Sequence, residues 1–504
     1  MKKICILGLG YIGLPTAAMF ATHGFDVVGV DVNDSVVELI NNGDVHIHEP
    51  GLKTLAHAAL KSGCLKATRQ PEPADAFIIA VPTPLSTAHG PQLPDSGGPV
   101  TSQPTADLSY VIAAAESIVP YLSPGNLVVL ESTVPPQTTT EVVLPILERS
   151  GIRVSRELVT PREGSTSISK GGDGVARSLS EARDLGFGDD SGCVSLSSGV
   201  SELHLAHSPE RVLPGRILKE LMRNDRVIGG VSWAAAERAK ALYASFVEGE
   251  ILLTDATTAE MVKLMENTYR DVNIALANEF ALVSEQMEVD VWKAIEIANR
   301  HPRVQILNPG PGVGGHCIAV DPWFLVQVAP AVTPLIQSAR RVNDGMPRHV
   351  VGLVKRALSR LRDVPSKMDT QVSKGTVACL GLAYKADVDD VRESPALAVV
   401  ALLQAEGFVV RAYDPHVPLG TVPGQVHSLE AAVEAADVIV VLTDHSEFCQ
   451  MQADALSHFP GQVIIDTRNM LAKDAASPEG FVVRQRERLD SNLRVWPLGC
   501  CSSL

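Results

Sequence analysis

The sequence has few aromatic residues, an excess of negative charge and no long apolar runs. Phe, Trp and Tyr make up only 4% of its 504 residues, although hydrophobic residues make up 45%, enough for packed layers of helices and strands. The formal net charge of -15 argues against a nucleic-acid partner, because a phosphate backbone would be repelled, but local cations can still hold a small phosphorylated ligand. No apolar run reaches the roughly 18 residues of a membrane span, so we expect no membrane partner.

CxxC motifs are also lacking. The eight cysteines include no CxxC pair, so neither a disulfide framework nor a metal site is predicted. Lys2 and Lys3 followed by an apolar run resemble a secretory signal, but the same run carries three glycines at nucleotide-binding spacing. The segment Cys501–Leu504 formally fits a prenylation box, but its middle residues are serines and no polybasic stretch precedes it. We therefore predict a cytoplasmic protein.

The length of the chain and its apolar runs predict about three domains. Strand-like and helical stretches alternate over residues 1–253, which indicates a doubly wound parallel sheet. A long helix without proline, from about Asp255 to Val289, opens a helical domain predicted over 254–350. A second Rossmann-like sheet, without a GxGxxG turn, is predicted over 351–470, followed by a tail at 471–504. The predicted fold class is therefore α/β, with two Rossmann-like doubly wound parallel-sheet domains joined by a helical domain with a long central helix.

The individual elements follow from the same patterns. Residues 86–105 and 164–201 are rich in small and polar residues, and we expect them to be insertions in the first domain without a core of their own. Strands are predicted at residues 3–7, 26–30, 76–81, 127–130, 376–380, 408–413, 438–442 and 463–465, and helices at residues 14–23, 110–119 and 394–406.

A glycine-rich turn after the first predicted strand indicates a dinucleotide site. Gly8 permits a tight turn, Gly10 lets the backbone approach a pyrophosphate, and Gly13 allows close packing of helix on strand. Asp31 ends the next predicted strand, where a carboxylate binds the ribose hydroxyls and repels a 2′-phosphate, so NAD is favoured over NADP. Glycine turns in unrelated loops are the usual alternative. The predicted cofactor residues are Gly8, Gly10, Tyr11, Ile12, Gly13 and Asp31.

One thiol lies in a second glycine-rich segment. Cys317 and His316 follow Pro309–Gly315, which is Gly or Pro at every position except Val313. Such a loop closes tightly on a ligand and leaves the sulfur unshielded. A thiol beside NAD suggests that an alcohol is oxidised to an aldehyde, trapped by sulfur, oxidised again to a thioester and released by water as a carboxylate. A structural thiol is the alternative, and it is the commoner role of a single cysteine.

Three polar residues share one face of the predicted long helix. Lys263, Asn267 and Arg270 stand at positions i, i+4 and i+7. An amide between two basic side chains offers donors for an oxyanion and for an anionic ligand. A merely solvated polar stripe explains the spacing equally well.

These motifs resemble the UDP-glucose/GDP-mannose dehydrogenase family along nearly the whole chain. The most specific stretch is His301–Val304 followed by Pro309–Phe324, which favours the branch that acts on UDP-N-acetylmannosamine. The other matching stretches are Gly8–Pro15, Ala80–Pro84, Glu131–Thr133, Ser208–Gly215, Asn267–Asn278 and Gly381–Pro395. The resemblance implies NAD-binding, helical dimerising and UDP-binding domains, and therefore a homodimer.

The resemblance also implies roles for single residues. Cys317 is the expected nucleophile, and Lys263 and Asn267 are expected to polarise the C6 oxygen of the sugar and to stabilise anionic intermediates. Glu210 matches the family residue that positions or activates water for thioester hydrolysis, and Asp321 matches a carboxylate that supports this step. Expected cofactor contacts are Thr83, Thr133 and Arg392, and expected nucleotide-sugar contacts are Arg211, Val212, Arg270, His301, Arg303, Gly312, Tyr384, Lys385 and Arg468.

The sequence departs from the family pattern in three places. Gln137 stands where relatives usually have glycine, Arg468 stands where they often have lysine, and the segment 164–201 is longer than expected. The expected reaction is the four-electron oxidation of a UDP-N-acetylhexosamine to its uronate, with two NAD and one water, for a surface polysaccharide. The alternatives are a UDP-GlcNAc or UDP-glucose 6-dehydrogenase, a two-electron Rossmann dehydrogenase, and a non-catalytic nucleotide-binding scaffold.

Overall fold

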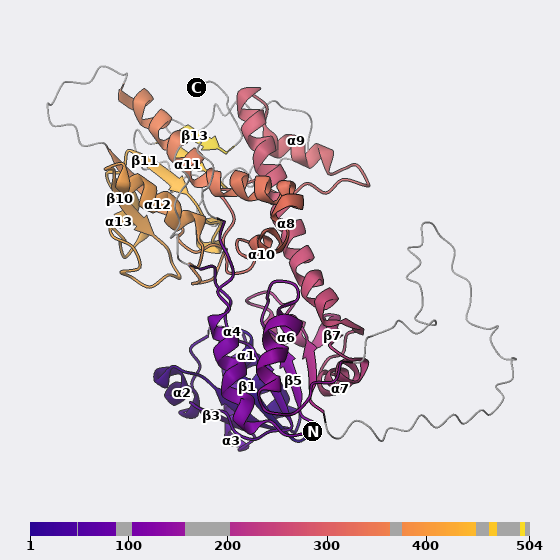
Figure 1. Cartoon of the computed structure of the whole chain (residues 1–504). Coiled ribbons are helices and arrows are strands. Elements are labelled where there is room, and N and C mark those ends of the chain that lie inside the picture. Colours follow the sequence, from indigo (N-terminus) through magenta and orange to yellow (C-terminus); the bar gives the residue numbers. More distant parts are fainter. Residues whose placement is uncertain are drawn as a thin grey trace, which may run out of the picture. The chain divides into compact units, whose positions relative to one another are not determined.

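The computed structural model describes residues 1–47, 49–86, 103–156, 202–362, 375–449, 463–470 and 494–498 (Figure 1). These residues belong to two units, which we describe in turn. The first unit comprises Met1–Pro82, Ser109–Ser132 and Gln137–Glu260, and the second comprises Thr83–Leu108, Thr133–Pro136 and Met261–Leu504. The insertion predicted at 164–201 and most of the one predicted at 86–105 lie outside the described residues. No described helix is long and apolar enough to cross a membrane.

The first unit contains an eight-stranded sheet with the order β3-β2-β1-β4-β5-β6-β7-β8. All neighbouring strands are parallel except β6 and β7, which are antiparallel. The strand order reverses between β1 and β4, and ligands of doubly wound sheets bind beside the carboxyl ends of the strands at such a switch point. The strands are β1 Lys3–Leu7, β2 Asp26–Val30, β3 Leu65–Thr68, β4 Ala76–Ile79, β5 Leu127–Leu130, β6 His204–His207, β7 Arg226–Gly230 and β8 Ile251–Asp255.

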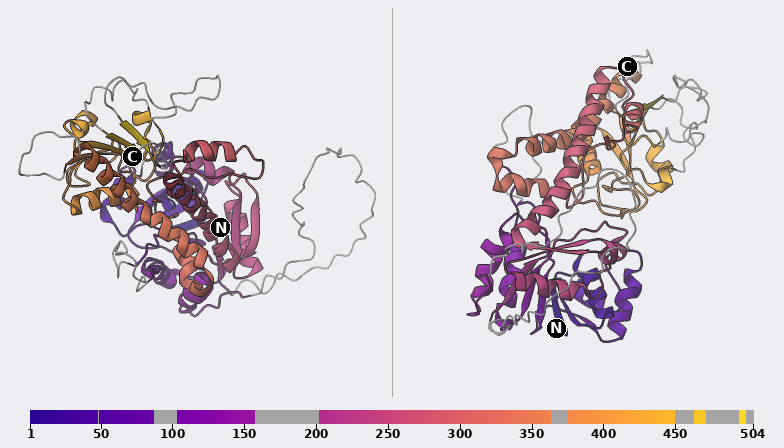
Figure 2. Two further views of the ribbon diagram at one scale, coloured as in Figure 1. Left: turned by 90° about the horizontal axis from the view of Figure 1, so that it is seen from above. Right: turned by 90° about the vertical axis from the view of Figure 1, so that its right-hand side faces the viewer.

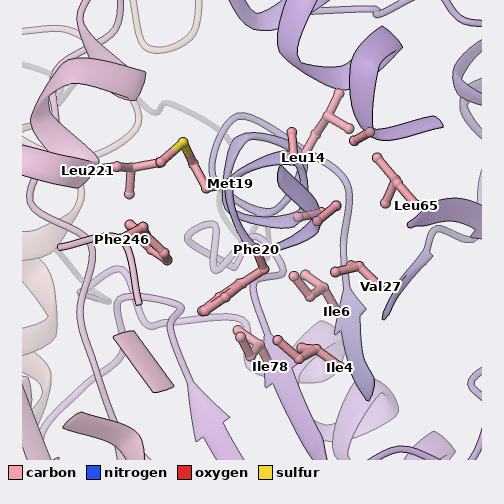
Figure 3. Packing of buried hydrophobic residues seen from close by; sticks show 14 of the residues in the cluster. Ile4, Ile6, Leu14, Met19, Phe20, Val27, Leu65, Ile78, Leu221 and Phe246 are labelled. Atoms are coloured by element: carbon pink, nitrogen blue, oxygen red, sulfur yellow. The ribbon is translucent and has the colours of Figure 1, made fainter. Parts of the chain in front are cut away.

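Both faces of the central strands are covered. Alternate residues of β1 and β4, such as Ile4 and Ile78, join a buried cluster with Phe20 of the first helix, and Figure 3 shows the ring of Phe20 directed toward these strands. Residues of the opposite parity, such as Phe77, are also fully buried. Strands that are covered on both faces read as continuous apolar runs, which is why the sequence predicts them well. The helices of this unit are α1 Gly13–Thr22, α2 Asp34–Asn41, α3 Leu52–Lys61, α4 Ser109–Ile118, α5 Leu144–Glu148, α6 Ile217–Arg223 and α7 Trp233–Tyr243, with a 3-10 turn at Val119–Tyr121 and a π-helix at Thr139–Val143.

The second unit contains a five-stranded parallel sheet with the order β10-β9-β11-β12-β13. Val377 and Cys379 of β9 pack in one cluster with two helices, α11 and α12, whereas Ala378 and Leu380 of the same strand pack in another cluster with α13. The elements are β9 Thr376–Leu380, β10 Val409–Tyr413, β11 Val438–Val441, β12 Val463–Asp466, β13 Arg494–Pro497, α11 Pro334–Arg362, α12 Pro395–Ala405, α13 Leu429–Val433 and α14 Ser446–Cys449. The edge strand β13 lies within the segment for which the sequence predicts a tail.

The long helix predicted from the sequence is α8, Ala256–Gln286. It is the long rose-coloured helix in the right-hand view of Figure 2, and its first turn belongs to the first unit while the rest belongs to the second. The helices α9 Val291–Ala298 and α10 Asp321–Val328 and a 3-10 turn at Pro330–Val332 follow. The predicted boundary at residue 350 falls inside α11, which continues through Pro347. The predicted fold class, two Rossmann-like sheets and a helical region with a long helix, is confirmed.

Candidate active site

The dinucleotide turn of the first unit has the geometry that its glycines predict. Gly8 has a φ of 90°, and a Cβ there would lie 2.6 Å from the carbonyl oxygen of Ala80, directly after β4. A Cβ on Gly13 would lie 1.8 Å from the carbonyl oxygen of Gly8. Gly10, in contrast, has nothing within 4 Å of the position of a Cβ. The turn therefore closes on itself at two glycines and offers open backbone at the third, which fits a bound pyrophosphate at the start of α1.

Asp31 is attached to the same turn. One carboxylate oxygen accepts the N–H of Leu9 at 3.0 Å, and the other accepts the N–H of Asn33 at 2.9 Å. Each carboxylate oxygen has a second lone pair, so a ribose hydroxyl can still donate to it. The predicted residues Tyr11 and Ile12 lie in the turn and are partly buried. The residues of this turn thus fit NAD, with the negative charge of Asp31 opposing a 2′-phosphate.

In the second unit, the loop before the thiol packs closely against the segment 381–395. A Cβ on Gly314 would lie 2.7 Å from the Cβ of Tyr384, and a Cβ on Gly315 would lie 2.9 Å from the ring of Tyr384. The N–H of Gly315 donates to the carbonyl oxygen of Arg392 at 3.0 Å. Cys317, two residues on, is partly exposed. The glycines are therefore required by the close approach of two segments, and the sulfur is not sealed in a core.

The loop before the thiol also packs against Arg468, Pro395 and Asn278. A Cβ on Gly310 would lie 2.9 Å from a guanidinium nitrogen of Arg468. Gly312 has a φ of 135°, and a Cβ there would lie 2.9 Å from the Cβ of Pro395. The N–H of Gly310 donates to the side chain of Asn278 on α8 at 2.8 Å. The loop is thus held between the long helix and the second sheet domain.

Three polar side chains meet where α8 passes the start of α10. The side-chain amide of Asn267 donates to the carboxylate of Asp321 at 2.5 Å, and both Asp321 and Lys263 are buried. Burial raises the pKa of Asp321 to about 6, while the positive charge of Lys263 and the bond from Asn267 act in the opposite direction. The N–H of Asp321 donates to the carbonyl oxygen of Cys317 at 2.8 Å, so the thiol residue anchors the first turn of α10.

His316 lies beside the thiol as a neutral ring. Burial and the positive charges of Arg392 and Lys263 lower its pKa to about 4, although Asp390 opposes them. Its Nδ1 is buried and has no hydrogen-bond partner among the described residues. Arg392 itself is held by Asp390 through two bonds, of 2.9 and 2.6 Å.

The predicted residues fall into two sets, one in each unit. Glu210 is buried in the first unit, while Arg211, whose guanidinium donates to the carbonyl oxygen of Asp225 at 2.8 Å, is more exposed. In the second unit the hydroxyl of Thr83 donates to the carbonyl oxygen of Thr133 at 2.6 Å. The first set is Gly8, Gly10, Tyr11, Ile12, Gly13, Asp31, Glu210, Arg211 and Val212, and the second is Thr83, Thr133, Lys263, Asn267, Arg270, His301, Arg303, Gly312, Cys317, Asp321, Tyr384, Lys385, Arg392 and Arg468.

The sequence did not point to Glu260, in the first turn of α8. Its carboxylate accepts the N–H of Gln137 at 2.6 Å and both the N–H and the hydroxyl of Thr139, at 2.8 and 2.6 Å. Gln137 has a φ of 75°, a conformation that favours glycine. The local sequence carries no signal for this role, because the partners of Glu260 are more than a hundred residues away in the chain.

One cluster has the composition of a cation site but not its bonding. Atoms of Asp387, His416 and His445 lie within 4.8 Å of one another. However, Nδ1 of His445 accepts the N–H of Asp387 at 3.0 Å, and its Nε2 bonds the carboxylate of Asp414 at 3.0 Å. Since both ring nitrogens are engaged, a hydrogen-bond network explains the cluster without a metal.

Comparisons with known proteins match nearly the whole chain. Residues 2–247 match the NAD binding domain of the UDP-glucose/GDP-mannose dehydrogenase family, residues 257–345 its central domain and residues 378–473 its UDP binding domain. The chain is 44% identical to the UDP-N-acetyl-D-mannosamine dehydrogenase of Methanocaldococcus jannaschii, over 96% of each chain. It is 43% identical to the NDP-N-acetyl-D-galactosaminuronic acid dehydrogenase of Ralstonia nicotianae, over 93% of this chain and 96% of that one. The solved UDP-D-ManNAc dehydrogenase of Pyrococcus horikoshii is 41% identical and superposes with a TM-score of 0.77 over 99% of both chains.

Proposed function

Because this chain belongs to the UDP-glucose/GDP-mannose dehydrogenase family, we propose that it oxidises the C6 hydroxyl of UDP-N-acetyl-D-mannosamine to the carboxylate. The prediction of NAD as the cofactor is confirmed by the match to the NAD binding domain of the family. The product is a nucleotide-activated uronic acid, which suits a precursor of a surface polysaccharide. Both NAD and a nucleotide sugar favour the cytoplasm as the location.

The observation that carries the proposal is the packing of the thiol loop against Tyr384 and Arg392. These two residues lie in the range that matches the UDP binding domain, and Gly314 and Gly315 approach them without any side chain between. A sugar held by a nucleotide-binding segment would therefore present its far end close to Cys317. Binding energy from the distant diphosphate can in this way fix C6 in the reacting orientation.

The remaining predicted contacts suit the nucleotide sugar. Arg270, Arg303 and Lys385 are exposed cations, which can meet the diphosphate charges. Gly312 allows the close approach of backbone, while Tyr384 offers an aromatic ring. Arg211, Val212, His301 and Arg468 complete the residues that we propose to contact the substrate.

We propose that the chemistry proceeds in three steps on this chain's residues. The glycine turn, Thr83, Thr133 and Arg392 would hold NAD, which would supply the hydride acceptor for the first two steps. In the first, the C6 hydroxyl loses its proton toward Lys263 or a linked water, while the amide of Asn267 stabilises the negative oxygen. In the second, Cys317 adds to the aldehyde carbon and the adduct becomes a thioester.

In the third step, water replaces sulfur. A water molecule gives a proton to the carboxylate of Glu210 as its oxygen bonds the thioester carbon, and the carbon–sulfur bond then breaks. The buried carboxylate of Asp321 supports this step by holding Asn267, to which it is hydrogen bonded. The balance is one alcohol and one water converted to one carboxylate, with two NAD reduced.

The experiment is a panel of UDP-ManNAc, UDP-GlcNAc, UDP-glucose and GDP-mannose with NADH counted per sugar consumed. We add a nucleotide-linked N-acetylgalactosamine substrate, because the relative from Ralstonia nicotianae is named for the galacto sugar. Preference for UDP-ManNAc with two NADH per sugar supports the proposal. One NADH per sugar would favour a two-electron dehydrogenase, and NAD binding without turnover of any sugar would favour a non-catalytic scaffold.

We also propose that the protein is a homodimer through its central helical domain. Large apolar side chains of α8 recur at helical spacing and are exposed, namely Met261, Met265, Tyr269, Leu276, Phe280 and Val283. A stripe of this kind usually marks a protein interface, and two copies of one helix can cover each other. Phe280→Asp combined with Val283→Asp should give a monomer in sedimentation, whereas Ile297→Asp, an exposed apolar change on α9, should not. A double variant that sediments like the wild type would contradict this interface.

A further inference from the structure

A buried ionic cluster of the first unit surrounds Arg226 at the start of β7. The antiparallel pairing of β6 and β7, with Ala206 opposite Gly230, places the start of β7 beside the segment that follows β6, where Glu210 lies. The side chains of Arg226 and Glu210 are 6% and 8% exposed, and one guanidinium nitrogen lies 3.9 Å from a carboxylate oxygen of Glu210. The two charges are thus close in a place where water screens them little.

Three other groups fix the orientation of this guanidinium. Its second terminal nitrogen bonds the carboxylate of Glu131 at 3.1 Å and the hydroxyl of Ser208 at 2.9 Å. The ring of Tyr243 lies 4.1 Å from the guanidinium carbon, and its hydroxyl donates to the same carboxylate of Glu131 at 3.3 Å. Glu131 is completely buried at the end of β5. A planar group held on one edge and one face cannot turn away, so its remaining nitrogen stays directed at Glu210.

The distance of 3.9 Å between Arg226 and Glu210 suits a catalytic base better than the shorter distance of a structural ion pair would. A separation of 3.9 Å is longer than a hydrogen bond, so the attraction stabilises the charged carboxylate without placing a short N–H donor on that oxygen. Glu210 and Arg226 also line a small hollow of about 10 Å³, together with Pro209, Arg211, Asn224 and Asp225. Its volume is about that of a single water molecule.

We infer that Arg226 is the positioning residue for Glu210 in the release of the acid, and that Glu131 and Tyr243 hold Arg226 in place. The inference rests on the proposed function, since Glu210 needs to act on water only when a thioester has formed on Cys317. In that step the water proton passes to Glu210, the water oxygen bonds the thioester carbon and the thiolate leaves. Arg226 touches none of these atoms, so it acts only through the carboxylate.

The test separates the oxidation steps from the release step in the full-length protein. With Arg226→Lys and UDP-ManNAc, we expect two NADH per active site to form rapidly, as in the wild type. Release of the acid should slow by about 100-fold, the scale of a general base, and intact-protein mass should show the sugar attached to Cys317. Arg238→Lys is the matched control, because that arginine donates to the carbonyl oxygen of Gly125, away from Glu210, and should leave release unchanged.

A double-mutant cycle then tests the coupling to Glu210. Glu210→Gln alone should accumulate the same thioester, and adding Arg226→Lys to it should slow release no further. If the two substitutions slowed release by the product of their separate effects, the positioning role of Arg226 would be overturned. Equal slowing of oxidation and release in Arg226→Lys would overturn it as well. If Arg226→Lys does not fold, Tyr243→Phe keeps the ring and removes only the bond to Glu131; it should slow release severalfold and spare oxidation, and unchanged release would count against the inference. A wild type that forms one NADH per sugar would instead reject the proposed function itself.

Discussion

The amide of Asn267 and the carboxylate of Asp321 are joined at 2.5 Å, although 54 residues separate them in the chain. This bond ties the middle of α8 to the first turn of α10, which the carbonyl oxygen of Cys317 also anchors. Hydrogen bonds therefore link Asn267, Asp321 and Cys317, one through the side chain of Asp321 and one through its backbone.

Replacing Asp321 by asparagine should remove the part of the pH dependence of folding stability that comes from titration of its carboxyl group. Burial raises the pKa of Asp321 from 3.8 to about 6, so the folded state binds this proton more tightly than the unfolded state does. The resulting stabilisation is complete below pH 4 and is lost as the pH rises through 6. The urea midpoint of the wild type minus that of Asp321→Asn should therefore decrease as the pH is raised from 4 to 6.5. A constant difference across this range would show that the carboxyl group titrates normally.

Replacing Cys317 by serine should abolish formation of the acid and spare the binding of NAD. A serine hydroxyl does not form the thioester on which the second oxidation depends, so we expect at least about a 1,000-fold loss of uronate formation. Cofactor fluorescence should give the same NAD affinity as the wild type. Cys449→Ser, at an exposed cysteine, is the control and should be fully active. An unchanged yield of uronate from Cys317→Ser would exclude the thioester route.

Replacing Asp31 by alanine should weaken NAD binding and narrow its advantage over NADP. The change removes the acceptor of the ribose hydroxyls and a negative charge that repels a 2′-phosphate, so NAD affinity should fall by about 10-fold to 100-fold. Titration with both cofactors measures the effect. Asp34→Ala, at an exposed carboxylate in the first turn of α2, serves as the control. Equal losses in the two variants would argue against a ribose contact.

Replacing Gln137 by glycine should stabilise the protein. Gln137 has a φ of 75°, where a side chain costs energy, and its N–H bond to Glu260 does not depend on the side chain. We expect a gain of about 0.5–1 kcal/mol, because relief of strain outweighs the added freedom of the unfolded chain. Thermal unfolding of Gln137→Gly and Gln137→Ala gives the comparison, since alanine keeps the strain. A destabilised glycine variant would show that the glutamine side chain contributes contacts of its own.

Much of the fold could be predicted from the sequence, because buried parallel strands read as continuous apolar runs and glycine turns mark their ends. The strands β1, β2, β4 and β5 and those from β9 to β12 were predicted in this way. β6 was missed because His204 and His207 do not look like strand residues, yet both are buried. α11 was missed because it is rich in arginine and contains Pro347.

Only those site residues that lie in short local motifs could be predicted from the sequence. The turn at Gly8–Gly13 and the thiol loop each lie within one short segment, so their spacing is visible in the sequence. The bond between Asn267 and Asp321, and the approach of Arg226 to Glu210, are produced by tertiary packing. A lone arginine at the start of a strand carries no local signal of such a role.

The close packing of the thiol loop has a consequence for how this chain can vary. Gly312, Gly314 and Gly315 leave no space for even one methyl group, although their segment has no regular secondary structure. A mutational scan should find that this loop tolerates substitution as poorly as the centre of a sheet does. Changes of sugar preference during evolution would then have to arise in the side chains around the loop rather than in the loop itself.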